Sequence, residues 1–208
     1  MGIMRWLQKI KEEKDILTGD ALKHKVFSSS NKFPSTKIAK EEFKRSMAKL
    51  FKINLWTHLP GITATFQLYG PQGEKKYTTH KPNVDDYVRI DFPGPFPENW
   101  VKITDFNQLE ALVEFTVKPS QDPTATDVDK EKTAHFFKDI SSSTFRIEIK
   151  NKTLYAYQIG LNEMINNKGE EAGDRKMINT LLAETGRVGF QQFQWKLLTD
   201  YLVHKIEI

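Results

Sequence analysis

The sequence contains no cysteine, which excludes disulfide bonds, cysteine-ligated zinc, thiol nucleophiles and iron–sulfur clusters. It also lacks any apolar run approaching the roughly 18 residues that predict a membrane-spanning helix. Arg5, Lys9 and Lys11 interrupt the apolar start of the chain, so this start does not have the pattern of a secretory signal. These absences favour a cytoplasmic protein, with peripheral contact to a membrane as the alternative location.

The sequence also has none of the short motifs that announce a phosphate-binding loop, a dinucleotide site or a hydrolase nucleophile. Its five histidines do not occur at the H-x-x-x-H or H-E-x-x-H spacing of zinc sites. Asp127 and Asp129 lack the following glycine and glutamate of a calcium-binding loop. The sequence therefore predicts no catalytic residue, no metal site and no cofactor.

Charge is distributed unevenly along the 208 residues, whose net charge is +4. Residues 1–52 hold 13 basic and 6 acidic residues, whereas the rest of the chain holds 18 basic and 21 acidic residues. Such a basic segment is typical of contact with an anionic partner, although a solvated lysine-rich surface gives the same pattern. The acidic balance of the remainder and the absence of an RNA-binding motif argue against nucleic acid.

An amphipathic helix is expected over residues 3–14, because apolar side chains recur there on one face. We expect its apolar residues to anchor on a partner protein, or to lie in a membrane interface, while its basic residues steer the encounter. The predicted partner-binding residues are Arg5, Trp6, Leu7, Lys9, Ile10 and Lys11. Ser28–Asn31 and Phe33-Pro34 predict a linker, which divides the chain into an N-terminal segment, 1–34, and one domain, 35–208.

The rest of the chain changes from helical to alternating periodicity and back. An apolar stripe and a cap at Ser35 or Thr36 predict a helix over 36–51. Alternating apolar and polar residues predict strands at 62–68, 87–92 and 144–150. Further strands are expected at 75–79 after a turn, at 100–104 and 112–117, and at 153–159, which is rich in β-forming residues. The strands at 144–150 and 153–159 form a β-hairpin around Asn151-Lys152, and 118–130 is an exposed loop. Apolar stripes at 177–182 and 190–202 predict C-terminal helices, with a break at Gly186 or Gly189.

Runs of strands beside runs of helices indicate the α+β class. We predict an antiparallel sheet of about six to eight strands, flanked by N-terminal helices and packed against C-terminal helices. This layout resembles that of helix-grip domains, in which a curved antiparallel sheet wraps a long C-terminal helix around a hydrophobic cavity. The resemblance is one of layout alone, so it implies no site residue.

Aromatic residues in the sheet supply the candidate ligand site. Tyr155 and Tyr157 point to the same side of their strand, opposite Leu154 and Ala156. Asn162 and Glu163 follow the end of that strand, where a polar pair can lie at the mouth of a cavity or simply satisfy a turn. The predicted ligand-binding residues are Tyr155, Tyr157, Asn162 and Glu163.

Three hypotheses of function follow from these features. The first is a non-catalytic binding or assembly protein that docks on a protein partner through its basic amphipathic N-terminal segment. The alternative is a carrier of a lipid or another hydrophobic small molecule, with a cavity between the sheet and the C-terminal helix. The third is a hydrolase that uses Glu163, His135 or Asp91, with Ser141–Ser143 near His135 as the least supported nucleophile.

Overall fold

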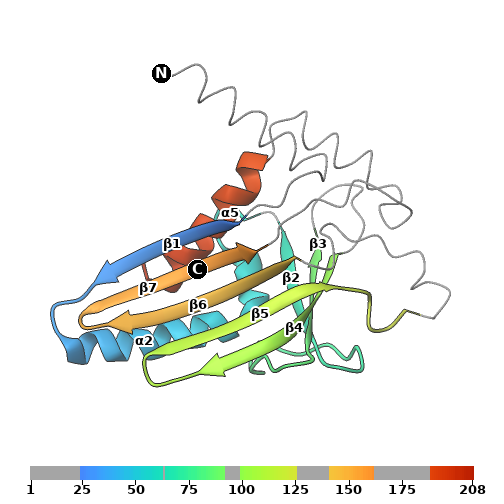
Figure 1. Ribbon diagram of the computed structural model, residues 1–208, viewed down its shortest axis with the longest axis horizontal. Helices are drawn as coiled ribbons and strands as arrows, with labels where there is room; N and C mark the ends of the chain where they lie inside the picture. The colour runs from blue at the N-terminus through green and yellow to red at the C-terminus, as the bar shows by residue number, and fades with distance from the viewer. Residues whose placement is uncertain (1–23, 63, 92–98, 126–140, 162–187) are drawn as a thin grey trace, which may run out of the picture.

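The computed structural model describes residues 24–62, 64–91, 99–125, 141–161 and 188–208. They form a seven-stranded antiparallel sheet in the order β1-β7-β6-β5-β4-β3-β2 (Figure 1). The strands are β1 (Lys25–Lys32), β2 (Thr65–Tyr69), β3 (Tyr87–Asp91), β4 (Asn99–Gln108), β5 (Leu112–Ser120), β6 (Ser142–Lys150) and β7 (Thr153–Leu161). The helices are α2 (Thr36–Phe51), the 3-10 helix η1 (Ile53–His58) and α5 (Val188–Leu202). The predicted antiparallel sheet and the α+β class are confirmed.

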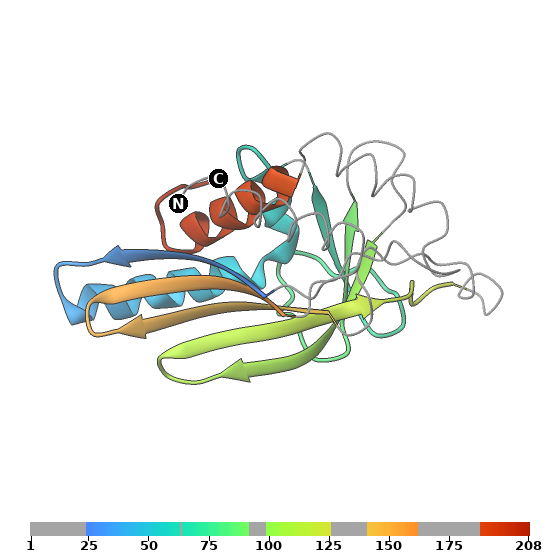
Figure 2. The same ribbon diagram turned by 45° about the horizontal axis from the view of Figure 1, so that its top comes forward.

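Helices α2 and α5 cover the same face of the sheet, which curves around them (Figures 1 and 2). Helix α2 lies against β6 and β7, and α5 lies against β1 and β7 and also contacts α2. The C-terminal helix therefore packs on the sheet as predicted. Of the predicted N-terminal helices, the one over 36–51 is α2, which packs on the same inner face of the sheet. None of the described helices is long and apolar enough to cross a membrane.

Helix α2 confirms the predicted bounds of 36–51. The side chain of Ser35 caps it by accepting a hydrogen bond from the backbone N–H of Ile38 at 3.2 Å. Its buried face includes Phe43 and Leu50, which enter the main core. The helix ends at Phe51, and the chain turns directly into η1, where alternating strand structure was expected.

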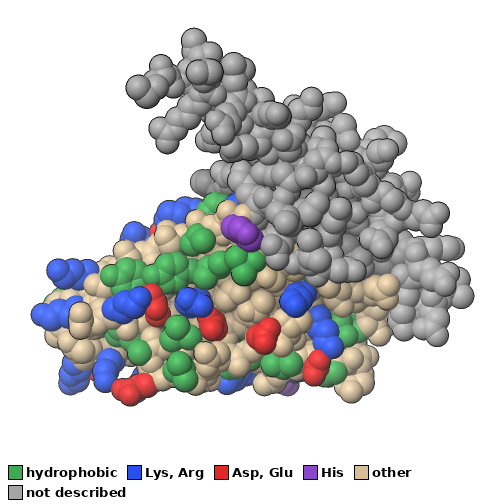
Figure 3. Space-filling model, in the orientation of Figure 1, with side chains coloured by type: hydrophobic (Ala, Val, Ile, Leu, Met, Phe, Trp, Pro, Cys, Tyr) green, Lys and Arg blue, Asp and Glu red, His purple; other side chains and the backbone are tan. Residues whose placement is uncertain are grey.

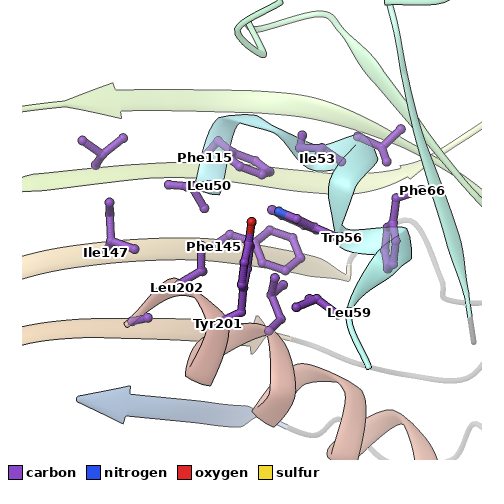
Figure 4. Close-up of a cluster of buried hydrophobic side chains, with 14 of the residues drawn as sticks. Leu50, Ile53, Trp56, Leu59, Phe66, Phe115, Phe145, Ile147, Tyr201 and Leu202 are labelled. Carbon is purple, nitrogen blue, oxygen red and sulfur yellow. The ribbon is translucent and has the colours of Figure 1, made fainter. Parts of the chain in front are cut away.

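Side-chain alternation separates the two faces of the sheet. On β6, Phe145 and Ile147 are buried under the helices, whereas Arg146 and Glu148 point to the outer face. The inner residues of the strands join residues of α2, η1 and α5 in one core (Figure 4). The labelled members of this core are Leu50, Ile53, Trp56, Leu59, Phe66, Phe115, Phe145, Ile147, Tyr201 and Leu202.

Strand β1 corrects the linker that was predicted at Ser28–Asn31. These residues pair with β7 in antiparallel register, with Ser29 opposite Ala156. Ser29 is buried, and its hydroxyl lies 2.9 Å from the hydroxyl of Thr199 and 2.7 Å from a carboxylate oxygen of Asp200 on α5. Hydrogen bonds to α5 thus satisfy the buried hydroxyl of Ser29, which allows this serine-rich segment to form an edge strand. A separate N-terminal segment stays a prediction for residues 1–23, which lie outside the described residues.

The predicted strand at 75–79 is wrong. Lys75 forms only an isolated bridge to Tyr69, and β2 pairs instead with β3, residues 87–91. The physical reason lies at Lys76, whose backbone oxygen accepts hydrogen bonds from the side-chain amides of Asn54 and Gln67 at 2.9 Å each. Pairing of β2 with residues 75–79 therefore cannot continue beyond Lys76. Strand β5 also runs further than predicted, to Ser120, into the expected loop.

The chain after α5 is held against α2 by a cluster of charged groups. The ammonium of Lys49 lies 2.8 Å from a carboxylate oxygen of Glu207 and donates to the backbone oxygen of Tyr201 at 2.9 Å. The ring of His204 is 5% exposed, and its Nε2 lies 2.9 Å from the backbone oxygen of Glu42. Burial lowers the pKa of His204, assisted by the positive charge of Lys49, and burial also lowers the pKa of Lys49.

Candidate ligand cavity

A cavity of about 90 Å³ lies between the inner face of the sheet and helix α5. Its walls are mostly apolar and come from η1, from strands β2 to β6 and from α5. The apolar residues that line it are Ile53, Trp56, Ala64, Phe66, Val88, Ile90, Val101, Phe115, Val117, Pro119, Phe145 and Trp195. Empty apolar space of this size is uncommon in close-packed cores, and an engineered apolar cavity of roughly 150 Å³ stays dry and binds benzene.

Aromatic rings form a continuous cluster along the cavity. The ring of Trp56 lies with its centroid 5.2 Å from that of Phe145 and 5.8 Å from that of Phe66. Phe145 in turn meets Trp195 of α5 edge to face at 5.5 Å. Figure 4 shows Trp56, Phe145 and Phe66 converging from η1, β6 and β2. These rings offer faces and edges to a small apolar group.

The position of Trp56 depends on the turn from α2 into η1. Its indole N–H donates to the backbone oxygen of Lys49 at 3.1 Å, a carbonyl near the end of α2. The end of the helix thereby gains a partner, and the indole ring is turned toward the sheet. Leu50 and Ile53 are buried on either side of this turn.

One end of the cavity is polar but carries no buried charge. Ser143 lines it, and the hydroxyl oxygen of Ser143 accepts a hydrogen bond from the Nε2 of Gln158 at 3.2 Å. Gln158 is wholly buried, and no atom of the described chain donates to its Oε1. Gln194, also buried, lines the cavity from α5. Among the described lining residues only Lys118 is charged, and strand alternation places its exposed side chain on the outer face.

Two of the predicted ligand-binding residues lie on the opposite face of the sheet from this cavity. Tyr155 and Tyr157 lie on the same side of β7, as predicted, and stack side by side with ring centroids 6.3 Å apart. Leu154 and Ala156, on the opposite side of the strand, are buried. Figure 3 shows this outer face, where basic and acidic side chains alternate beside hydrophobic ones. The structure therefore does not bring these tyrosines to the cavity.

The polar surroundings of Tyr157 satisfy its hydroxyl, which donates to a carboxylate oxygen of Glu148 at 2.9 Å. Partial burial, together with this bond, raises the pKa of Tyr157 to about 12. Lys150 lies 2.8 Å from the same carboxylate oxygen. A ligand role for the outer tyrosines stays a prediction.

The remaining predicted residues fall in two groups. The partner-binding residues 5–11, and also His135, Asn162 and Glu163, lie outside the described residues, so docking through the N-terminus stays a prediction. The helix at 3–14 and the stripe at 177–182 lie there too. Asp91 is described, and its carboxylate is 2.9 Å from the Nε of Arg89 on the same strand. In the described ranges, no group of three or more histidine, aspartate or glutamate side chains is placed to hold a metal ion.

Sequence reasoning missed most of the cavity residues. Phe66 and Phe145 were predicted as strand residues, and Trp195 as part of a helix, but no pattern distinguished them from ordinary core. Trp56 carried no periodic signal because η1 interrupts the expected strand pattern. Ser143 was noted only within the serine run that precedes the hairpin. The sequence signal that could have identified Ser143 is its spacing of two and four residues from Phe145 and Ile147, which places the Ser143 hydroxyl on an otherwise apolar face of β6.

One solved structure has a similar fold at low sequence identity. No family model matches the sequence, and no curated protein is similar to it. A hypothetical protein of Helicobacter pylori is similar with a TM-score of 0.50 at 9% identity, over 93% of this chain and 94% of that one. This similarity establishes the fold alone.

Two further similarities are weaker. A norcoclaurine synthase mutant of Thalictrum flavum has a TM-score of 0.39 at 18% identity, covering 89% of this chain and 99% of that one. A major latex-like protein of Panax ginseng has a TM-score of 0.39 at 12% identity, covering 83% and 99%. Both TM-scores are below 0.5.

Proposed function

We propose that this protein binds a small hydrophobic molecule in the cavity between the inner sheet face and α5. The observation that carries the proposal is the apolar pocket itself, bordered by Trp56, Phe145 and Trp195. A core that served stability alone would be expected to close around such a space, because each cubic ångström of cavity costs stability. A cavity retained at this cost is typical of a binding site.

The size of the cavity limits the ligand. Typical small-molecule pockets are about 300–1,000 Å³, whereas this cavity is about 90 Å³. A ring or a short branched chain fits within it, and a whole lipid does not. The proposed ligand is therefore a small apolar compound, or a larger one that inserts only an apolar end.

Two tryptophans report on this site, which makes binding directly measurable. The full-length protein is titrated with toluene and with 1-butanol while the indole N–H NMR signals of Trp56 and Trp195 and the thermal unfolding midpoint are measured. Saturable binding raises the free energy of unfolding by about 2.7 kcal/mol when the ligand is present at 100 times its Kd. A matched control is the Val117→Phe variant, whose larger side chain occupies the cavity.

Binding to the wild type that is lost in Val117→Phe supports the proposal. Equal responses of the two proteins place the probes elsewhere, and the absence of any saturable response to either probe contradicts the proposal. Native mass spectrometry of protein purified from its own cells then gives the mass of a retained ligand.

A further inference from the structure

At the edge of the cavity, the hydroxyl group of Ser143 accepts one hydrogen bond and can still donate one. Its oxygen accepts from Gln158 at 3.2 Å, so the hydroxyl proton of Ser143 is available to donate. Among the residues that the structure describes, none accepts that proton. Phe145 and Ile147, two and four residues further along β6, are buried under the helices, so alternation points Ser143 to the same inner side.

The burial of Gln158 next to Ser143 lowers the stability of the folded protein. Its side chain is 0% exposed, yet its Oε1 accepts no hydrogen bond within the described chain. A buried polar atom without a partner destabilises a protein, and a leucine at this position would avoid that cost. The single bond that Gln158 does make orients the hydroxyl of Ser143. Gln158 is thus a positioning residue for a donor at the edge of an apolar cavity.

The lack of buried charge around the Ser143 hydroxyl restricts the kind of ligand group that it can bind. No described side chain brings a buried charge to the cavity, and Lys118 extends from the outer face. A carboxylate buried there would lose its hydration without gaining a counter-charge. A neutral oxygen loses far less, and it can accept the proton of Ser143.

We propose that the cavity selects neutral hydrophobic compounds bearing a carbonyl oxygen, which accepts a hydrogen bond from the hydroxyl of Ser143 while the apolar part lies among Trp56, Phe145 and Trp195. This inference rests on the proposed function, because it names the ligand class of the same cavity. It adds one polar recognition point to a site that is otherwise apolar.

The test uses three probes of five non-hydrogen atoms each, which have nearly the same shape. These are 2-butanone, 2-methyl-1-butene and propanoate, which present a carbonyl, a methylene and a carboxylate group. Binding to the full-length protein is followed by NMR titration of the indole N–H signals of Trp56 and Trp195. The infrared stretching frequency of carbon-13-labelled 2-butanone reports directly on a hydrogen bond to its oxygen.

Ser143→Ala is the decisive variant. We expect it to weaken the binding of 2-butanone about tenfold, which corresponds to the loss of one hydrogen bond, and to change the binding of 2-methyl-1-butene less than twofold. The carbonyl stretch of bound 2-butanone moves to higher frequency in Ser143→Ala and in Gln158→Leu. Thr144→Val is the matched control, because it removes the neighbouring hydroxyl, which lies 2.8 Å from Thr116 on the outer face.

The possible results separate this inference from the proposed function. If 2-methyl-1-butene binds but Ser143→Ala weakens both probes equally or neither, the cavity binds ligands and the carbonyl preference is overturned. Propanoate binding as tightly as 2-butanone overturns it as well. If none of the three probes binds the wild type, the proposed function fails and the inference fails with it. Should Ser143→Ala not fold, a wild-type carbonyl stretch equal to that in hexane overturns the inference alone.

Discussion

Filling the cavity with a larger side chain should stabilise the protein, and the size of the effect follows from the structure. Val117 is 5% exposed on β5 and lines the cavity. At about 24 cal/mol per Å³, complete filling of the roughly 90 Å³ would raise the free energy of unfolding by about 2 kcal/mol. Val117→Phe fills part of this volume, so a gain between zero and about 2 kcal/mol is expected.

The same substitution in closely packed core provides the comparison. Val113 lies four residues earlier on the same face of β5, is 0% exposed and does not border the cavity. Val113→Phe must displace its neighbours, and such overpacking costs about 1–3 kcal/mol. The two variants carry the same change of side chain, so differences in the unfolded state largely cancel between them.

Urea unfolding of the wild type and both variants measures these differences, provided the slope with denaturant concentration stays constant. A domain of this size should also gain about 2–4 °C in Tm for each kcal/mol. Destabilisation of Val117→Phe equal to that of Val113→Phe would refute the reasoning, because it would mean that no usable space lies beside Val117.

Three further predictions concern residues outside the cavity. Ser35→Ala should lower the free energy of unfolding by about 1 kcal/mol, and Ser35→Gly by only a few tenths, as measured by urea unfolding. Because the pKa of His204 is lowered in the folded protein, the unfolded chain binds a proton at this histidine at a higher pH than the folded chain does. The contribution of neutral His204 to the free energy of unfolding is therefore present above pH 6.5 and is lost as the pH falls. His204→Asn, which tolerates the positive φ of 63°, should flatten the loss of stability between about pH 7 and 5. The phenol of Tyr157 should ionise near pH 12 by ultraviolet absorbance, and Glu148→Gln should bring that midpoint back toward 10.0; an unchanged midpoint would contradict the role of Glu148.

Elements with local signals could be predicted from the sequence. Helix α2 has both an apolar stripe and a capping serine within 17 residues, and its predicted bounds match. The β6–β7 hairpin likewise has alternation of apolar and polar residues on β6, β-forming residues on β7 and a two-residue turn at Asn151 and Lys152. In both cases the information that determines the structure lies within the segment itself.

Elements that depend on distant partners could not be predicted. Strand β1 is a serine-rich segment that becomes a strand because β7 and α5 satisfy its backbone and side chains. The partner of β2 is β3 rather than the nearer 75–79, because side chains from η1 and β2 occupy the backbone at Lys76. The cavity combines η1, five strands and α5, and no single segment carries its pattern.

The pairing of β1 with β7 and α5 also has a consequence for synthesis on the ribosome. Ser29 and Thr199, whose hydroxyls are 2.9 Å apart, are separated by 170 residues in sequence. Strand β1 therefore leaves the exit tunnel long before its neighbours exist, and the part of the inner apolar face that α5 covers, along β1 and β7, stays uncovered until α5 emerges. Contacts so distant in sequence form slowly, and uncovered strands attract other chains in the meantime. A nascent chain of this protein should accordingly engage chaperones until α5 emerges and covers this part of the sheet.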